Sequence, residues 1–156
     1  MSDFSIRAAL ASDSHLIVAL LRELAEYEKL LDRFCLTEEA VKRDMMGTAC
    51  RCDLAYAGDE VAGLVCWYWT YKSFGALRGI FIEDLYVRPR FRGQGMGKAL
   101  LAHVAGEARK AGGFLEWQVL DWNKPGIEFY RTLGAKPVEH WLNYRLEGEQ
   151  LERLAS

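Results

Sequence analysis

The sequence predicts an α/β protein in which helices pack against one mixed sheet. Its 156 residues are the size of a single domain, and 51 % of them are hydrophobic, which is enough to form a core. Segments with the two-residue period of strands alternate along the chain with segments that have the helical period. A glycine-rich turn joins one of these strands to the helix that follows it. We therefore expect one domain over residues 1–156.

The first elements are predicted from periodicity and capping residues. Phe4–Arg7 alternates as a short strand does. Ser12 or Asp13 can cap a helix, and Thr37 can cap a second one. The apolar positions of the first helix are Leu16, Ile17, Leu20, Leu21, Leu24 and Leu31.

Three consecutive strands are predicted next. Leu54–Ala57 and Val61–Tyr71 flank the turn dipeptide Gly58-Asp59, which is typical of a hairpin. Arg78–Val87 follows as a strand that is apolar on both faces, as in a sheet covered on both sides.

The rest of the chain alternates helices and strands. The helix after the glycine-rich turn is stopped by Gly112-Gly113. Phe114–Leu120 is a predicted strand, Asn123–Leu133 a helix with a proline in its first turn, and Trp141–Leu146 a closing strand. The apolar face of the helix that follows the glycine-rich turn consists of Met96, Leu100, Leu101, Val104 and Ala108.

The composition excludes several classes of protein. Twenty Lys and Arg residues against 22 Asp and Glu give a formal net charge of −2, so we expect neither a nucleic-acid nor a membrane partner. Met1–Ser5 lacks the basic and apolar regions of a signal peptide, and no apolar stretch is long enough to span a membrane. The spacing of the four cysteines fits neither a zinc site nor a disulfide framework. We expect a cytoplasmic protein with reduced thiols and no metal.

The glycine-rich turn is the most informative segment of the sequence. Gly93, Gly95 and Gly97 lie between a predicted strand and a predicted helix, where free backbone N–H groups and the positive end of the helix dipole can bind a phosphate. A tight turn that needs positive φ angles is the alternative. A P-loop is excluded because only three residues separate Gly93 from Gly97 and Ala99 follows Lys98. A dinucleotide fingerprint is excluded because Lys98 replaces its third glycine.

The spacing Arg92-x-x-Gly95-x-Gly97 does match a known motif. It resembles the pyrophosphate-binding motif of the GCN5-related N-acetyltransferases (GNAT), and the chain is similar to the diamine and thialysine branch of that family from about Ile6 to about Leu146. The matching stretches are Glu23-Leu-Ala-x-Tyr27-Glu28, Phe81-Ile-Glu83-Asp84-Leu-Tyr-Val87, Trp122-Asn123-x-Pro125 and Phe129-Tyr130-x-x-x-Gly134-Ala135.

The resemblance implies a fold, a co-substrate and an assembly. The fold is a GNAT-type mixed, mostly antiparallel sheet with helices on both faces and a splayed central strand pair for acetyl-CoA. The implied assembly is a homodimer. The residues that the resemblance places against acetyl-CoA are Leu85, Tyr86, Val87, Arg92, Gly93, Gln94, Gly95, Met96, Gly97, Lys98, Asn123, Lys124, Pro125, Gly126 and Tyr130.

Two adjacent carboxylates, Glu83 and Asp84, are candidates for taking a proton from an amine. A lysine-like ammonium has a pKa of about 10.4 and must lose a proton before it attacks a thioester. Burial and a like charge would raise the pKa of one carboxyl toward neutrality, whereas a buried ion pair with an arginine is the alternative. The resemblance implies that Glu83 is the base, acting through water, and that Asp84 holds the amine. It also implies a β-bulge that re-aims one carboxylate and frees an N–H for the thioester carbonyl.

Tyr130 is the candidate general acid. A tyrosine beside Phe129 and Leu133 is often only a core residue, but the equivalent tyrosine of the family protonates the departing thiolate of coenzyme A. At Glu116 the chain departs from mammalian diamine acetyltransferases, which have a histidine there, so the resemblance favours an amine without naming it. The residues that the resemblance assigns to the amine pocket are Tyr27, Glu28, Glu83, Asp84, Glu116, Trp117 and Glu139.

The sequence thus predicts an acetyl-CoA-dependent N-acetyltransferase. Its expected substrate is the primary amine of a small cation (a diamine, thialysine or a lysine-like molecule), which attacks directly in a ternary complex. No cysteine falls where the thioester is expected, which argues against a thiol nucleophile. The alternatives are acetylation of a protein lysine or N-terminus and a non-catalytic acyl-CoA sensor.

Overall fold

A five-stranded mixed sheet organises the first part of the chain in the computed structural model, which describes residues 4–156. Residues 1–3, part of the stretch in which no signal peptide is expected, lie outside the described residues. The chain divides into two compact units, one ending at Gln118 and one beginning at Val119, and each is described by itself. The expectation of one domain stays a prediction. None of the helices in the described part of the chain is both long and apolar enough to cross a membrane.

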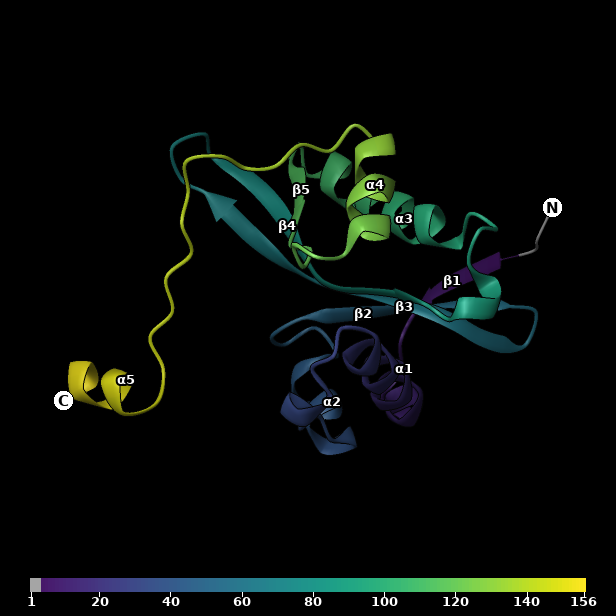
Figure 1. The fold of residues 1–156 in the computed structure, drawn as a ribbon, viewed down its shortest axis with the longest axis horizontal. Helices are drawn as coiled ribbons and strands as arrows, with labels where there is room; N and C mark the ends of the chain where they lie inside the picture. The colour runs from purple at the N-terminus through teal and green to yellow at the C-terminus, as the bar shows by residue number, and fades with distance from the viewer. Residues whose placement is uncertain (1–3) are drawn as a thin grey trace. The chain divides into compact units, whose positions relative to one another are not determined.

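The sheet of the first unit has the strand order β1-β2-β3-β4-β5 (Figure 1). The first four strands pair antiparallel and β5 pairs parallel to β4, which confirms a mixed, mostly antiparallel sheet. The strands are β1 Phe4–Ala8, β2 Arg51–Ala57, β3 Glu60–Lys72, β4 Leu77–Val87 and β5 Phe114–Trp117. The predicted hairpin is confirmed, because β2 and β3 are joined at Gly58, whose φ of 61° suits a tight turn.

β4 pairs with β5 over only part of its own length. Residues Gly79–Ile82 of β4 pair with Phe114–Trp117 of β5, and β4 then continues to Val87 paired with β3 only. β5 ends at Trp117, three residues before the predicted end at Leu120, because the last residue pair between β4 and β5 is Ile82 with Trp117. The expected splayed pair is therefore present.

Helices cover both faces of this sheet (Figure 1). α1 (Ser14–Tyr27) and α2 (Glu38–Asp44) lie on one face and α3 (Met96–Lys110) lies on the other. Short 3-10 turns, η1 (Ala11–Asp13), η2 (Leu31–Arg33) and η3 (Pro89–Phe91), occupy connections. All five apolar positions predicted for α3 are buried, whereas Leu31, predicted for the first helix, lies beyond α1 and is exposed.

One of the two predicted helix caps is confirmed and one is wrong. The Thr37 hydroxyl accepts the N–H of Ala40 at 3.2 Å and caps α2. Asp13 occupies the cap position of α1 but caps no helix N–H. Both of its carboxylate oxygens bind the Arg7 guanidinium, at 2.7 and 3.0 Å, because β1 brings that charge alongside, and Ser12 lies within η1.

The second unit contains helices and no strand within residues 119–156. α4 (Lys124–Thr132) confirms the helix predicted over Asn123–Leu133, and Asn123 caps it, because its side chain accepts the N–H of Gly126 at 3.2 Å. α5 (Gly148–Ala155) was not predicted. The predicted strand Trp141–Leu146 is wrong, because its alternating residues have no neighbouring strand in this unit to accept their backbone hydrogen bonds.

Candidate active site

An acidic cavity of about 570 Å³ opens in the first unit beside α1 and β4. Three of its lining side chains are carboxylates: Glu28, which follows α1, and Glu83 and Asp84 on β4. Apolar side chains from α1, α2 and the connection between them form most of the remaining wall. The structure thus brings together three of the residues predicted for the amine pocket.

A β-bulge in β4 explains why two consecutive residues face one cavity. Asp84 pairs with Cys66 and Ile82 pairs with Trp67, so Glu83 is an extra residue without a partner on β3. Consecutive residues of a regular strand point to opposite faces, but a bulge re-aims the extra side chain. Glu83 and Asp84 both line the cavity, which confirms the expected bulge and the re-aimed carboxylate.

The electrostatics of the pair are dominated by Asp84, which is half-buried, whereas Glu83 is exposed. Burial, followed by the charges of Glu83 and Glu28, raises the pKa of Asp84 to about 7. Burial also raises the pKa of Glu28. Within the described residues neither Glu83 nor Asp84 forms an ion pair, so the alternative of a structural pair with an arginine is not observed.

Cys50 is a cavity residue that the sequence did not single out. Burial, followed by the neighbouring Cys52 and Asp84, raises the pKa of its thiol to about 11. The thiol is therefore protonated at neutral pH and is a poor nucleophile. Cys52 and Cys66 are buried behind it with their sulfur atoms 3.5 Å apart, and all four cysteines are free thiols.

The other residues that the sequence missed come from the connection between α1 and α2. Arg33, Phe34 and Cys35 line the cavity, yet they belong to no motif. Their only sequence signal is that they lie between two predicted helices, which does not indicate where their side chains point.

The glycine-rich turn leads from β4 into α3. Gly93 and Gly95 have φ angles of 73° and 87°, and a Cβ atom at either position would meet no atom within 4 Å. Glycine is therefore required by the backbone conformation, and the space beside both residues is open. Gly95 is the N-cap of α3, where unpaired N–H groups and the helix dipole favour an anion. A pyrophosphate fits this place.

Arg92 connects this turn to the end of β4. Its Nε donates to the Val87 carbonyl at 2.8 Å, and its guanidinium lies 5.1 Å from the ring of Tyr27 and 5.6 Å from that of Tyr86. Two further predicted coenzyme residues, Tyr86 and Met96, are buried.

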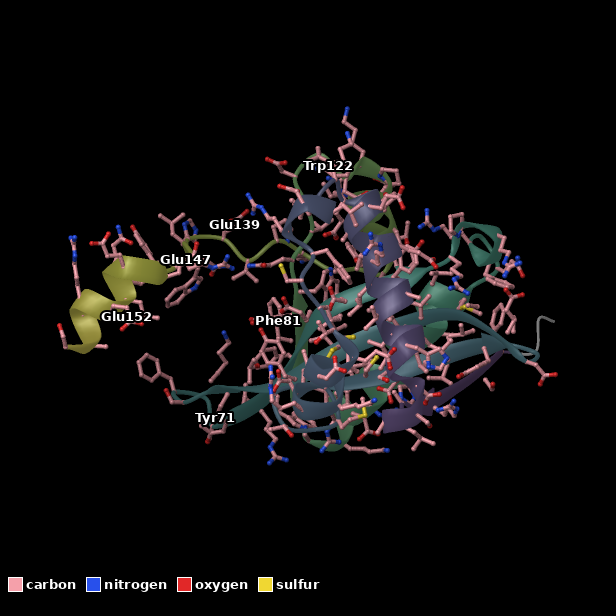
Figure 2. All side chains as sticks on the ribbon, turned by 90° about the horizontal axis from the view of Figure 1, so that it is seen from below. Tyr71, Phe81, Trp122, Glu139, Glu147 and Glu152 are labelled. Carbon is pink, nitrogen blue, oxygen red and sulfur yellow. The ribbon has the colours of Figure 1, made fainter. Side chains whose placement is uncertain are left out.

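Three predicted residues of the first unit lie outside the cavity lining. Tyr27, Glu116 and Trp117 do not line the cavity, and Glu116 is ion-paired to Lys72 at 3.4 Å. The second unit holds the start of α4, the exposed Glu139 on an extended segment (Figure 2), and Tyr130, whose ring lies 5.4 Å from that of Phe129. The roles of these second-unit residues toward the cavity stay predictions.

The chain belongs to the acetyltransferase (GNAT) family, whose family model matches residues 17–135. It is an N-acetyltransferase, as are the relatives that match it over 99 % of both chains, and members of this family use acetyl-CoA as their co-substrate. In the described part of the chain no three His, Cys, Asp or Glu side chains are grouped so that they could hold a metal ion.

Two relatives and one solved structure illustrate the similarity. Thialysine N-epsilon-acetyltransferase of Sus scrofa is 37 % identical, with 99 % of each chain covered. L-ornithine N5-acetyltransferase of Arabidopsis thaliana is 43 % identical over 60 % of this chain and 42 % of its own. An integron cassette protein from Vibrio cholerae shares the fold with a TM-score of 0.81 at 23 % identity, covering 99 % of this chain and 98 % of that one.

Proposed function

We propose that the chain transfers the acetyl group of acetyl-CoA to a primary amine of a small cation, by direct attack in a ternary complex. The observation that carries this proposal is the acidic cavity, in which the bulge turns Glu83 and Asp84 toward one space. An acidic pocket favours a cation such as a diamine, thialysine or a lysine-like molecule. The names of the relatives, which act on thialysine and ornithine, support the same substrate class.

In this proposal the backbone of the glycine-rich turn holds the pyrophosphate at the start of α3. Acetyl-CoA supplies the activated thioester. Arg92 holds the turn against β4, and the bulged N–H at Glu83 is available to the thioester carbonyl. Leu85 and Val87 lie on the end of β4 that pairs with β3 but not with β5. The resemblance assigns Asn123, Lys124, Pro125, Gly126 and Tyr130 to acetyl-CoA as well, and the proposal keeps these roles.

The Glu83–Asp84 pair accepts the proton of the amine. The resemblance makes Glu83 the base, acting through water, and gives Asp84 the role of holding the amine. The raised pKa of Asp84 supports Asp84 as a further group that takes up a proton near neutral pH, while the exposed Glu83 exchanges the proton with water. Glu28 adds negative charge that attracts the ammonium. Tyr130 donates a proton to the departing thiolate, for which a neutral phenol is suited.

A homodimer is part of the proposal. Trp141, Leu142 and Tyr144 are 80, 80 and 91 % exposed on the extended segment of the second unit. Three large apolar side chains within four residues are costly in water, and a second copy of the chain would cover them. Tyr71, labelled in Figure 2, is a further exposed aromatic residue at the end of β3.

The decisive experiment measures thiol release from acetyl-CoA with purified protein and a panel of amines. The panel contains lysine, thialysine, ornithine, short diamines, an aminoglycoside and a lysine-containing peptide, and mass spectrometry identifies the products. We expect acetylation of the small amines and little of the peptide. Preference for the peptide would support protein acetylation instead. Binding of acetyl-CoA without turnover on any amine would support the non-catalytic sensor.

A further inference from the structure

The acidic cavity also contains one basic side chain, Arg33, at the end of η2. Among the described residues that line the cavity, no other is a lysine or arginine. A positively charged side chain is unexpected in a pocket that binds cations, because it lowers the affinity for a substrate that carries only positive charge. The positive charge of Arg33 would be favourable if the ligand also carried a negatively charged group.

Arg33 is not used to neutralise the carboxylates around it. Within residues 4–156 it forms no ion pair, although Glu28, Glu83 and Asp84 line the same cavity. Its side chain is exposed, so its five N–H donors are open to a ligand. The planar fork of a guanidinium matches a carboxylate in a bidentate geometry.

The cavity therefore offers two kinds of recognition to one molecule. The carboxylates suit ammonium groups, and Arg33 suits a carboxylate. A diamine satisfies only the first, while an amino acid with a side-chain amine satisfies both.

We propose that Arg33 binds the α-carboxylate of the acceptor and makes the enzyme select an amino acid with a side-chain amine over the diamine of the same chain length. This inference rests on the proposed function and names the residue that sets its specificity. Arg33 positions the acceptor and takes no part in proton transfer. Its contribution therefore appears in the binding of carboxylate-bearing amines.

The test compares substrate pairs that differ only in the α-carboxylate: lysine with 1,5-diaminopentane, and ornithine with 1,4-diaminobutane. Arg33→Gln should lower kcat/KM for lysine by about tenfold, mainly through KM, since one exposed charge-assisted contact is lost. The value for 1,5-diaminopentane should stay the same or rise. Arg33→Lys, which keeps the charge but not the fork, should recover part of the lysine activity.

Lys42→Gln is the matched control, because Lys42 is a half-exposed cation on α2 that does not line the cavity. It should leave the ratio of lysine to diamine activity unchanged, and thermal melts should show all variants folded. Calorimetry of lysine binding gives a readout that is independent of turnover. Equal losses on lysine and diamine, or no loss on either, would overturn the role of Arg33 and leave the proposed function intact. Failure of the wild type to acetylate any of these amines would overturn the proposed function, and this inference with it.

Discussion

Asp84 is a half-buried carboxylate whose neighbours in the cavity, Glu83 and Glu28, share its negative charge. A pKa of about 7 makes it partly protonated at neutral pH, which is where a general base transfers protons most effectively. An aspartate in an ordinary surface position has a pKa about three units lower. In the proposed mechanism, the environment of this one residue therefore sets the pH range of activity.

The first prediction concerns the pH profile. In the wild type kcat/KM should rise with pH through an ionisation near 7, because the protonated carboxyl cannot accept the amine proton. Asp84→Asn should remove this ionisation and leave only that of the amine. Glu83→Gln should move it to lower pH, because the loss of a neighbouring negative charge lowers the pKa of Asp84. Steady-state kinetics from pH 5.5 to about 9.5 measure all three. Survival of the wild-type ionisation in Asp84→Asn would assign the base to Glu83 alone.

The second prediction concerns Gly95. Gly95→Ala should weaken acetyl-CoA binding by roughly tenfold, since an alanine disfavours the positive φ that aims the turn's N–H groups at the pyrophosphate. Gly112→Ala is the control: Gly112 also has a positive φ (69°) and open space around its Cβ position, but it lies after the other end of α3. Both variants should lose ~1 kcal/mol of stability. Equal affinities by calorimetry would reduce the turn to a structural role.

The third prediction concerns Tyr130. Tyr130→Phe keeps the ring that contacts Phe129 and removes only the hydroxyl, so the melting temperature should change little. The value of kcat should fall by about 10²–10⁴-fold, the usual contribution of a general acid. Turnover within a factor of about three of the wild type would make Tyr130 a packing residue.

At the scale of elements, the bulge in β4 is the feature on which the site depends. It follows from one extra residue, Glu83, between two regular pairings with β3, Cys66 with Asp84 and Trp67 with Ile82. The rest of the β3–β4 ladder is regular, and only the residues of the bulge face the cavity. An irregularity of one residue thus converts a core strand into part of an active site.

The fourth prediction separates the bulge from the side chain that it carries. Deletion of Glu83 should restore regular pairing and leave the protein folded. Activity should fall roughly a hundredfold further than in Glu83→Ala, because the deletion also removes the bulged N–H that is proposed to stabilise the developing oxyanion. Circular dichroism checks the fold and kcat/KM checks the effect. Similar activities for the two variants would show that the bulge only presents a carboxylate.

Elements were predictable where local chemistry alone determines them. Thr37 immediately precedes the helix that its hydroxyl caps. The apolar residues of α3 have the helical period, so they form one face that packs on the sheet. The prediction of Asp13 as a cap was wrong because the Arg7 guanidinium, on the preceding strand, binds its carboxylate instead. The prediction of a strand at Trp141–Leu146 was wrong because alternating apolar and polar residues do not ensure that a neighbouring strand is there to pair with.

On the scale of the whole molecule, the site combines residues that the sequence marks with residues that it does not. Glu28, Glu83 and Asp84 belong to matched motifs and were predicted. Arg33 and Cys50 lie in connections between the α-helices and strands, and hydrophobic periodicity does not predict the course of such connections or that these residues line the cavity. The matched motifs therefore indicated the chemistry, while the rest of the pocket wall required the structure.

The fifth prediction concerns assembly. The wild type should sediment as a dimer, and the double variant Trp141→Ser, Tyr144→Ser should shift toward the monomer, because the apolar side chains that favour association are removed. Leu154→Ser, at an exposed position on α5, is the control and should stay dimeric. A monomeric wild type at micromolar concentration would contradict the proposed assembly.

The carboxylate cluster in the cavity has a consequence for folding. The folded chain binds a proton at Asp84 more tightly than the unfolded chain, in which the pKa is near 3.8, so this residue contributes stability below that pH. The contribution is lost as the pH rises through about 7. A bound ammonium restores part of it by supplying the counter-ion that the cavity wall lacks at this position. The acceptor amine is therefore both a reactant and a temporary part of the folded structure.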